Sequence, residues 1–396
     1  MTTPRFLLEE KFRSNPRYEL MEWNRLSQSE QQALTGLSKN EEAFGLFVPV
    51  HEDPQLTYKV AYKEVALLYY TLLHQQVLPA YTRLEEKEEM NESIARLVLE
   101  GVLEMEWQEE FVSGAAAHQA IYEVHQPPEC KRSPDRDASR ISDLSLQALE
   151  YAILLEELDT RSIASRLYNY NTLPDVAERM SAFRTLTGLE DFLGIAPGAP
   201  YEWQLNRHWQ KHTASAESKW ISWSRKGVQQ DRKESDLTYK LYISPNWEAL
   251  PKTLVLSIKA LSSSAAFSFK IGNDPHGLLR SDKMVVYFQR YEDLLQTAAA
   301  LEPALDGVEA QGVPFTAQLD KKGLLSWGVD PPGADVLENF EGGSWRARLT
   351  DKLAAAITNA KAAGLQRQDI LPYALHKIGL EGLDTGTWTP GRQIWQ

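Results

Sequence analysis

The sequence predicts an α+β protein with a mainly helical domain that includes a hairpin over residues 1–200 and an α/β domain over residues 201–396. Three observations predict this. The 396 residues suit two or three domains at roughly 150 residues each. Apolar residues make up 43% and charged residues 24%, as in ordinary globular proteins. The stretch Pro197-Gly198-Ala199-Pro200 then breaks the helical pattern and is the best candidate for the boundary.

The first half begins with helical patterns and one hairpin. Residues 59–78 and 92–99 carry apolar side chains at helical spacing. Residues 101–107 alternate with period two, residues 108–110 can turn the chain, and residues 111–114 return. A helix followed by a short hairpin is the outline of a winged helix. An ordinary hairpin packed on helices fits the same pattern, and we prefer that interpretation.

A polar stretch with prolines at residues 126–141 predicts a loop or linker. Helices are expected after it at 142–158, where the amphipathic pattern is strong, and at 161–170. Beyond residue 200 strands and helices alternate, which favours an α+β or α/β domain. The expected strands are 239–244, 266–271, 283–288 and 313–319, and the expected helices are 250–262, 291–304 and 344–363.

Charge is spread unevenly along the chain. The net charge is −13, from 42 basic and 55 acidic residues, which argues against a nucleic-acid binder. Residues 201–290 nevertheless hold 14 basic and 8 acidic side chains. The rest of the chain therefore holds 28 basic and 47 acidic side chains. This basic region predicts a site for an anionic ligand, although a fluctuation of charge on a solvated face would look the same.

The single cysteine, Cys130, excludes a disulfide framework and a metal site built from several thiolates. No apolar run is long enough for a signal peptide or a membrane span. We therefore expect a cytoplasmic protein without membrane or nucleic-acid partners.

Several common catalytic motifs are missing from the sequence. It has neither a phosphate-binding loop nor a dinucleotide fingerprint, and no zinc-protease or nucleophile-elbow motif. His208 and His212 could share one helix face, but without a third ligand a surface or packing role is preferred. Four tryptophans could stack a ligand or fill a seam between domains, namely Trp203, Trp209, Trp220 and Trp223. No metal or cofactor is expected.

Cations and phenols recur on the expected strands of the second half. Period two points Lys240 and Tyr242 to one face, and Lys270 lies near the end of an apolar strand. Fixed cations can hold a phosphate, and a lysine that is buried near other cations loses its proton more readily and can act as a base. The remaining members of the set are Arg280, Lys283, Tyr287 and Arg346.

Five motifs carry a family resemblance, covering roughly residues 205–365. They are YKLYISP at 239–245, FKIG at 269–272, GLLRSDKMVVYF at 277–288, GVPFT at 312–316 and SWR at 344–346. The sequence resembles the HopA-type effector family, a domain similar to the lyases of class V lanthipeptide pathways and, more distantly, to phosphothreonine lyases. The resemblance implies a phosphothreonine-lyase-like fold for the second domain.

The resemblance also implies a reaction, the β-elimination of phosphate from phosphoserine or phosphothreonine in a peptide. The product is dehydroalanine or dehydrobutyrine, and no cofactor is needed. Lys270 takes the role of the base and Lys240 that of a phosphate ligand. The acid position holds Tyr242 where the related lyases have histidine, so Tyr242 and His276 are both candidates, or the phosphate leaves as a dianion. The phosphate and peptide would be held by Arg280, Lys283, Tyr287 and Arg346.

Three hypotheses follow from this pattern. The first is a lyase in lanthipeptide-like (RiPP) maturation that acts on a phosphorylated precursor peptide. A separate Ser/Thr kinase would supply the substrate, because the chain has no kinase motif, and residues 1–200 would recognise the leader peptide. The second is a non-catalytic phosphopeptide-binding protein, in which Tyr242 marks lost chemistry. The third is a secreted HopA-like effector.

Overall fold

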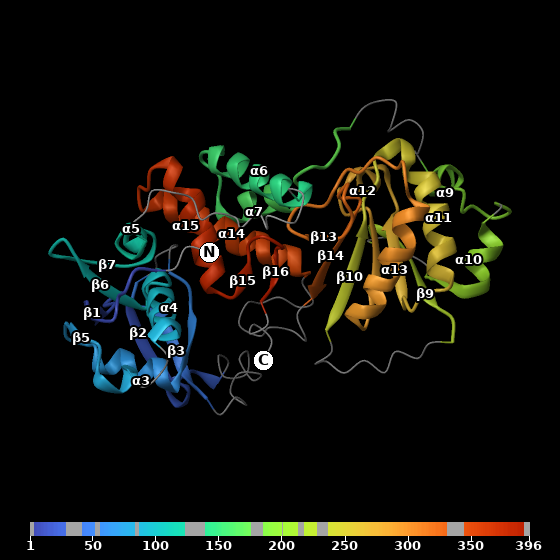
Figure 1. The fold of residues 1–396 in the computed structure, drawn as a ribbon. Coiled ribbons are helices and arrows are strands. Elements are labelled where there is room, and N and C mark those ends of the chain that lie inside the picture. Colours follow the sequence, from blue (N-terminus) through green and yellow to red (C-terminus); the bar gives the residue numbers. More distant parts are fainter. Residues whose placement is uncertain are drawn as a thin grey trace.

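The computed structural model describes residues 4–28, 42–51, 56–83, 87–122, 139–175, 185–199, 201–212, 218–227, 237–330 and 344–391. Within these ranges the protein combines helices and sheets, as the sequence predicts. Two lobes lie side by side, with a group of helices between the sheets of the first lobe and the large sheet of the second (Figure 1).

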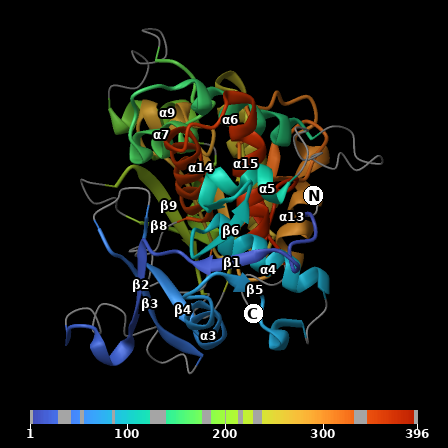
Figure 2. The same ribbon diagram turned by 90° about the vertical axis from the view of Figure 1, so that its left-hand side faces the viewer.

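Residues up to 122 form two small antiparallel sheets, which lie next to each other in Figure 2. Their strand orders are β5-β1-β6-β7 and β2-β3-β4. The strands are β1 (Lys11–Ser14), β2 (Tyr18–Glu22), β3 (Ala43–Pro49), β4 (Lys59–Tyr62), β5 (Gln76–Val77), β6 (Leu103–Trp107) and β7 (Glu110–Val112). The helices are η1 (Trp23–Arg25), α3 (Lys63–Thr71), η2 (Ala80–Arg83), α4 (Lys87–Leu99), η3 (Gly114–Ala117) and α5 (His118–Ile121).

The described residues up to 122 therefore hold two sheets where the sequence predicts a single hairpin. The single helix expected at 59–78 is divided into β4, α3 and β5. Tyr62, which precedes α3, has an extended backbone, and β4 and β5 pair with β3 and β1. Strand pairing with distant segments has thus outweighed the local helical pattern.

The hairpin expected at 101–114 is confirmed as β6 and β7. Its two turn residues, Gln108 and Glu109, both have positive φ, as the tightest hairpin turns require. A winged helix is not confirmed, because β6 also pairs with β1 and lies inside a four-stranded sheet.

Helices α6 (Arg140–Leu154) and α7 (Thr160–Tyr168) confirm the helices expected at 142–158 and 161–170. The Ser139 and Asp159 side chains accept hydrogen bonds from the first turns of these helices, which fixes where each helix begins. Most of the linker expected at 126–141 lies outside the described residues.

The second lobe is built on a seven-stranded sheet with the order β13-β14-β10-β12-β11-β9-β8, in which every pairing is antiparallel. The strands are β8 (Trp209–His212), β9 (Trp220–Arg225), β10 (Thr238–Ile243), β11 (Ser268–Gly272), β12 (Met284–Phe288), β13 (Ala317–Gln318) and β14 (Leu325–Asp330). Its helices are α9 (Leu186–Leu193), α10 (Glu202–His208), η4 (Trp247–Ala249), α11 (Leu250–Ser262), α12 (Pro275–Leu279) and α13 (Tyr291–Ala304).

Three of the four strands expected in this half are confirmed, as are the helices at 250–262 and 291–304. The strand expected at 313–319 is reduced to the two residues of β13. The sequence reading missed β8 and β9. His208 ends α10 whereas His212 lies on β8, so these two histidines do not share a helix face.

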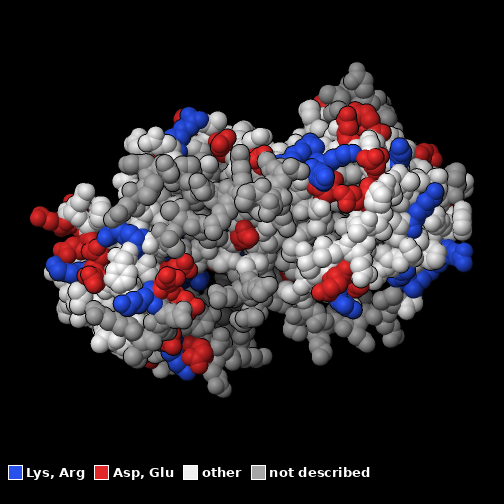
Figure 3. Space-filling view, viewed as in Figure 1, with Lys and Arg blue, Asp and Glu red and all other residues white. Residues whose placement is uncertain are grey.

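The two faces of this sheet differ in chemistry. One face is apolar and is covered by helices, among them α11 and α13 (Figure 1), in a core that includes Leu241, Phe269, Val286, Trp209 and Trp223. The opposite face carries Lys240 and Tyr242, as the period-two pattern predicts, and the strand register adds Lys270 and Tyr287 to it. On the side of the molecule seen in Figure 3, basic and acidic side chains are interspersed on both lobes.

The chain ends with α14 (Trp345–Ala362), which confirms the helix expected at 344–363, α15 (Arg367–Leu380), β15 (Leu383–Asp384) and β16 (Thr389–Pro390). Leu353, Ile357 and Tyr373 from these helices share one core with Leu149 and Leu167 of the first half. Residues 344–391 therefore pack with the N-terminal half. The division of the chain into two domains at residue 200 stays a prediction.

None of the helices in the described ranges is both long and apolar enough to cross a membrane.

We expect Leu353→Ala to lower the free energy of unfolding by about 2–5 kcal/mol, because it opens a cavity where α14 packs. Leu353 is fully buried in the core shared by both halves. Urea unfolding would measure the loss. Leu154→Ala on α6 is the matched control, since Leu154 is 48% exposed and its loss should change the free energy by no more than about 0.5 kcal/mol. Similar losses in both variants would contradict this shared core.

Candidate active site

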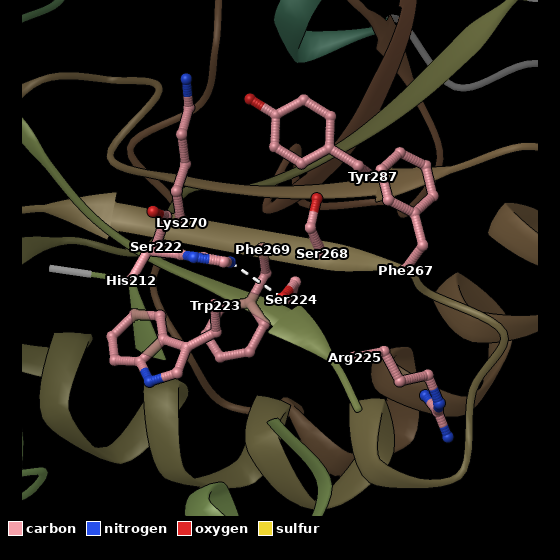
Figure 4. A pocket seen from close by; sticks show the side chains of 10 residues that line it. All are labelled: His212, Ser222, Trp223, Ser224, Arg225, Phe267, Ser268, Phe269, Lys270 and Tyr287. Atoms are coloured by element: carbon pink, nitrogen blue, oxygen red, sulfur yellow. Dashed lines mark hydrogen bonds between the residues drawn. The ribbon is translucent and has the colours of Figure 1, made fainter. Parts of the chain in front are cut away.

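The polar face of the seven-stranded sheet forms the floor of a pocket of about 480 Å³. Lys240 lies opposite Tyr287 across β10 and β12, and Tyr287 lies opposite Ser268 across β12 and β11. In Figure 4 the Lys270 amine and the Tyr287 hydroxyl point to the same side of the sheet, whereas Trp223 and Phe269 point toward the helices. The pocket is lined by His212, Ser222, Trp223, Ser224, Arg225, Phe267, Ser268, Phe269, Lys270 and Tyr287.

Lys270 is the amine of this pocket. Its Nζ lies 4.1 Å from the centre of the Trp220 ring and 5.7 Å from that of Tyr287. Burial, assisted by the positive charge of Lys240, lowers the pKa of Lys270 to about 8, although Asp282 and Asp330 act in the opposite direction. A substantial fraction of the amine is therefore neutral near neutral pH, and only the neutral amine can accept a proton.

Lys240 is held next to Lys270 by a buried ion pair. Its Nζ contacts Asp330 Oδ2 at the end of β14 and lies 5.6 Å from the centre of the Tyr287 ring. The Lys240 side chain is only 9% exposed, so its charge acts through a poorly solvated space. Tyr287 lies between the two lysines, and burial raises the pKa of its phenol, which keeps it protonated.

Asp282 joins two arginines beside this pocket. Arg280 donates to both carboxylate oxygens, at 2.7 and 2.9 Å, and Arg346 donates to Oδ2 at 2.9 Å. The Tyr168 hydroxyl, from the first half of the chain, donates to the same oxygen at 3.3 Å. Burial alone would raise the pKa of Asp282, but Arg346 and Arg280 hold it well below its usual value. Asp282 is thus a fixed anion between two fixed cations.

Arg280 and Lys270 share one aromatic neighbour, the ring of Trp220. The guanidinium carbon of Arg280 lies 5.6 Å from the centre of the Trp220 ring and 5.4 Å from the centre of the Tyr168 ring. Two aromatic rings and one carboxylate therefore fix the orientation of Arg280.

Two of the predicted phosphate ligands lie elsewhere. Lys283 is fully buried and donates to the carbonyl of Pro245 and to Gln311, and burial lowers its pKa to about 7. Arg346 is 1% exposed, and its three nitrogens donate to Pro314, Asp282 and the carbonyl of Tyr168. Protein acceptors thus take up part of the hydrogen-bonding capacity of both side chains, and the expectation that they hold phosphate stays a prediction.

The two candidate acids are also not at the pocket wall. Tyr242 is 3% exposed and packs with Val285 and Val313, and burial raises the pKa of its phenol well above the usual value. The His276 side chain is 66% exposed on α12, with Nδ1 3.3 Å from Asp175. The structure thus brings together Lys240, Lys270, Tyr287 and Arg280, with Tyr242 buried against Tyr287, and leaves His276 outside the group.

Four residues of this site were not predicted from the sequence. Trp220 was noted only as a stacking or seam residue, although β9 alternates so that Trp220, Ser222 and Ser224 share one face. Asp282 could have been noticed between two cations of the motif. Asp330 and Tyr168 carry no local signal, since their partners are distant in sequence. In the part of the chain that the structure describes, no three His, Cys, Asp or Glu side chains cluster closely enough to hold a metal ion.

We expect Asp282→Asn to lower the free energy of unfolding by about 3–5 kcal/mol at pH 7, because it leaves the buried Arg346 and the partly buried Arg280 without their counter-charge. The pKa of Asp282 is depressed in the folded protein. Its stabilising contribution is therefore complete above pH about 4 and is lost as the pH falls through the lower folded-state pKa. Urea unfolding between pH 7 and pH 3 would show a weaker pH dependence for the variant.

Asp306→Asn is the control for that measurement, because Asp306 pairs with Lys322 on the surface. It should leave the melting temperature unchanged. An Asp282→Asn protein as stable as the wild type would show that the arginines do not depend on this carboxylate.

No protein family model matches the chain, and no curated protein matches its sequence. The structure is distantly similar to effector proteins from Pseudomonas syringae. For strain DC3000 of pathovar tomato the identity is 14%, with a TM-score of 0.36 over 64% of this chain and 98% of that chain. For strain 61 of pathovar syringae the identity is 11%, with a TM-score of 0.39 over 63% of this chain and 99% of that chain. The type III effector and phosphothreonine lyase OspF from Shigella flexneri is 15% identical, with a TM-score of 0.28 over 43% and 90%.

Proposed function

We propose that this protein is a phosphate-eliminating lyase that acts on phosphoserine or phosphothreonine in peptides. The observation that carries the proposal is the state of Lys270. It is a pocket amine whose pKa is lowered to about 8, and it lies beside the cations Lys240 and Arg280. A general base must be neutral near the working pH, and positive charge must surround the anion that leaves.

In the proposed reaction, Lys270 Nζ takes the Cα proton of the phosphorylated residue. The electron pair of the Cα–H bond forms the Cα=Cβ double bond, and the Cβ–O bond breaks with its electrons on the phosphate. Lys240 and Arg280 stabilise the developing charge on the phosphate and on the peptide carbonyl. Tyr287, between the two lysines, donates a hydrogen bond to the phosphate, and protonated Lys270 then returns its proton to water.

The leaving phosphate needs no side-chain acid in this scheme. Tyr242 is buried among Val285, Val313 and Tyr287, and His276 is exposed beside Asp175. A phosphate monoester that reacts as its monoanion leaves as the dianion HPO₄²⁻ without an added proton, and the monoanion is populated near pH 7 because its second pKa is about 6. We therefore assign Tyr242 and Arg346 to positioning the strands and the Asp282 cluster, and His276 to the surface.

A non-catalytic phosphopeptide-binding protein is the second candidate, and one contact favours it. The Trp220 ring lies 4.1 Å from Lys270 Nζ, and an aromatic face at that distance stabilises the charged amine. A protonated Lys270 would bind phosphate but could not accept a proton.

We further propose a role in lanthipeptide-like (RiPP) maturation, with a separate Ser/Thr kinase that phosphorylates the precursor peptide. The sequence motifs between residues 239 and 346 support this context. If the first half of the chain recognises a leader, kcat/KM should be higher for a leader-bearing phosphopeptide than for the same phosphopeptide without it. Equal values would remove that role.

We expect Lys270→Met to abolish elimination while retaining affinity for a phosphoserine peptide, because it removes the base and leaves Lys240 and Arg280. The loss in kcat should be about 100-fold or more. Mass spectrometry would follow the loss of phosphoric acid, and calorimetry the binding. The control is Lys259→Met, because Lys259 is exposed on α11, a helix that packs on the other face of the sheet. A wild type that binds the peptide and leaves it intact would favour the binding protein.

The pH dependence of kcat/KM should follow the Lys270 amine of the free protein. The value of kcat/KM should rise with pH and level off above about 8, the pKa of Lys270, since the base must first lose its proton. Lys240→Met should move this rise upward by about one pH unit. It removes a positive charge that lowers the pKa and frees Asp330, which raises it. A rise at the same pH in both proteins would show that another group is the base.

A further inference from the structure

A side chain from the first half of the chain enters the charged cluster of the site. Tyr168 is the last residue of α7, and its ring lies under both guanidiniums, 4.6 Å from that of Arg346 and 5.4 Å from that of Arg280. Its hydroxyl donates to Asp282 at 3.3 Å, and its carbonyl accepts from Arg346 at 2.8 Å. One residue thus contacts all three members of the cluster.

The segment that follows α7 fixes Tyr168 in this place. The Asn171 side chain donates to the carbonyls of Gln311 and Gly312, at 2.9 and 3.1 Å. The Leu173 amide donates to the carbonyl of Leu279 at 3.0 Å, one residue before Arg280. Residues 168–173 therefore run along the loop that carries Arg280 and Asp282.

The other side of α7 is anchored as firmly. Ile163, Ala164 and Leu167 are buried in the core that α14 shares with the first half, and Arg346 lies in the first turn of α14. The position of the Tyr168 ring relative to the arginines is thus determined by the packing of α7 on α14. A change in that packing would therefore shift the Tyr168 ring relative to the two arginines.

We propose that Tyr168 is a positioning residue of the active site, through which the N-terminal half completes the phosphate-binding cluster. The proposal rests on the proposed function, in which Arg280 binds the phosphate. Arg280 is held between the Tyr168 and Trp220 rings, at 5.4 and 5.6 Å. Without the Tyr168 ring, Arg280 loses one of its two aromatic neighbours and Asp282 loses one hydrogen-bond donor. Affinity for the phosphorylated residue should fall, whereas the base, Lys270, should be unaffected.

The test compares three variants of the full chain. Tyr168→Ala should raise KM for a phosphoserine peptide about tenfold, in line with the loss of a partly desolvated cation–π contact. Its kcat should stay within about twofold of the wild type, and the pH at which kcat/KM rises should not move. Tyr168→Phe keeps the ring and should restore most of the affinity. Tyr170→Ala is the matched control, because Tyr170 lies two residues further and packs on Tyr151.

A purely structural role for Tyr168 predicts a different result. Melting temperatures of all three variants would then correlate with KM, and Tyr170→Ala would raise KM as much as Tyr168→Ala does. That outcome, or a Tyr168→Ala protein with the KM of the wild type, would overturn the proposal.

The same variants in a Lys270→Met background separate this proposal from the proposed function. Calorimetry with the phosphoserine peptide then measures binding without turnover. If the wild type binds but does not eliminate, the lyase proposal fails, while a tenfold weaker Kd for Tyr168→Ala still supports the positioning role. If the wild type does not bind the peptide, both proposals fail.

Discussion

The carboxylate of Asp282 holds together three parts of the chain that meet at the site. Arg280 comes from the same loop, Arg346 from the first turn of α14, and Tyr168 from the end of α7. Without an anion, the buried Arg346 and the partly buried Arg280 would repel each other in a poorly solvated space. With Asp282 between them they form a rigid unit in which the direction of Arg280 is determined. The rest of the site depends on that direction, because Trp220 connects Arg280 to Lys270.

The seven-stranded sheet separates the stabilising chemistry from the reactive chemistry. Its apolar face is buried under helices, which allows the opposite face to carry two lysines without losing the fold. The same burial that makes a charged lysine unfavourable lowers the pKa of Lys270 toward neutrality. Helix α14 connects this arrangement to the first half, since Arg346 lies in the cluster while Leu353 and Ile357 lie in the shared core.

The sequence predicts the strand-borne part of the site and misses the part that depends on tertiary packing. Period-two alternation is a local property, so it correctly places Lys240 and Tyr242 on one face, whereas the register of neighbouring strands adds Lys270 and Tyr287 to that face. It cannot show that Lys283 turns to Gln311 or that Arg346 turns to Asp282, because those acceptors are distant in sequence. The N-terminal sheets were missed for the same reason. Their strands are short, and each is stabilised by a partner from another segment.

The charges of the site suit the phosphate dianion that leaves in the proposed reaction. With Lys270 neutral, three cations (Lys240, Arg280 and Arg346) face two carboxylates (Asp282 and Asp330), a net charge of +1. A phosphate monoester bound as its monoanion brings the total to zero. The transfer of the Cα proton to Lys270 keeps that total, because the amine gains one positive charge while the phosphate leaves as a dianion. The proposed elimination therefore places the new positive charge beside the new negative charge inside a buried space, where uncompensated charge is most unfavourable. Three of these five charges, on Asp282, Arg280 and Arg346, contact Tyr168 directly, so the electrostatics that favour the reaction depend on the first half of the chain as well as on the sheet.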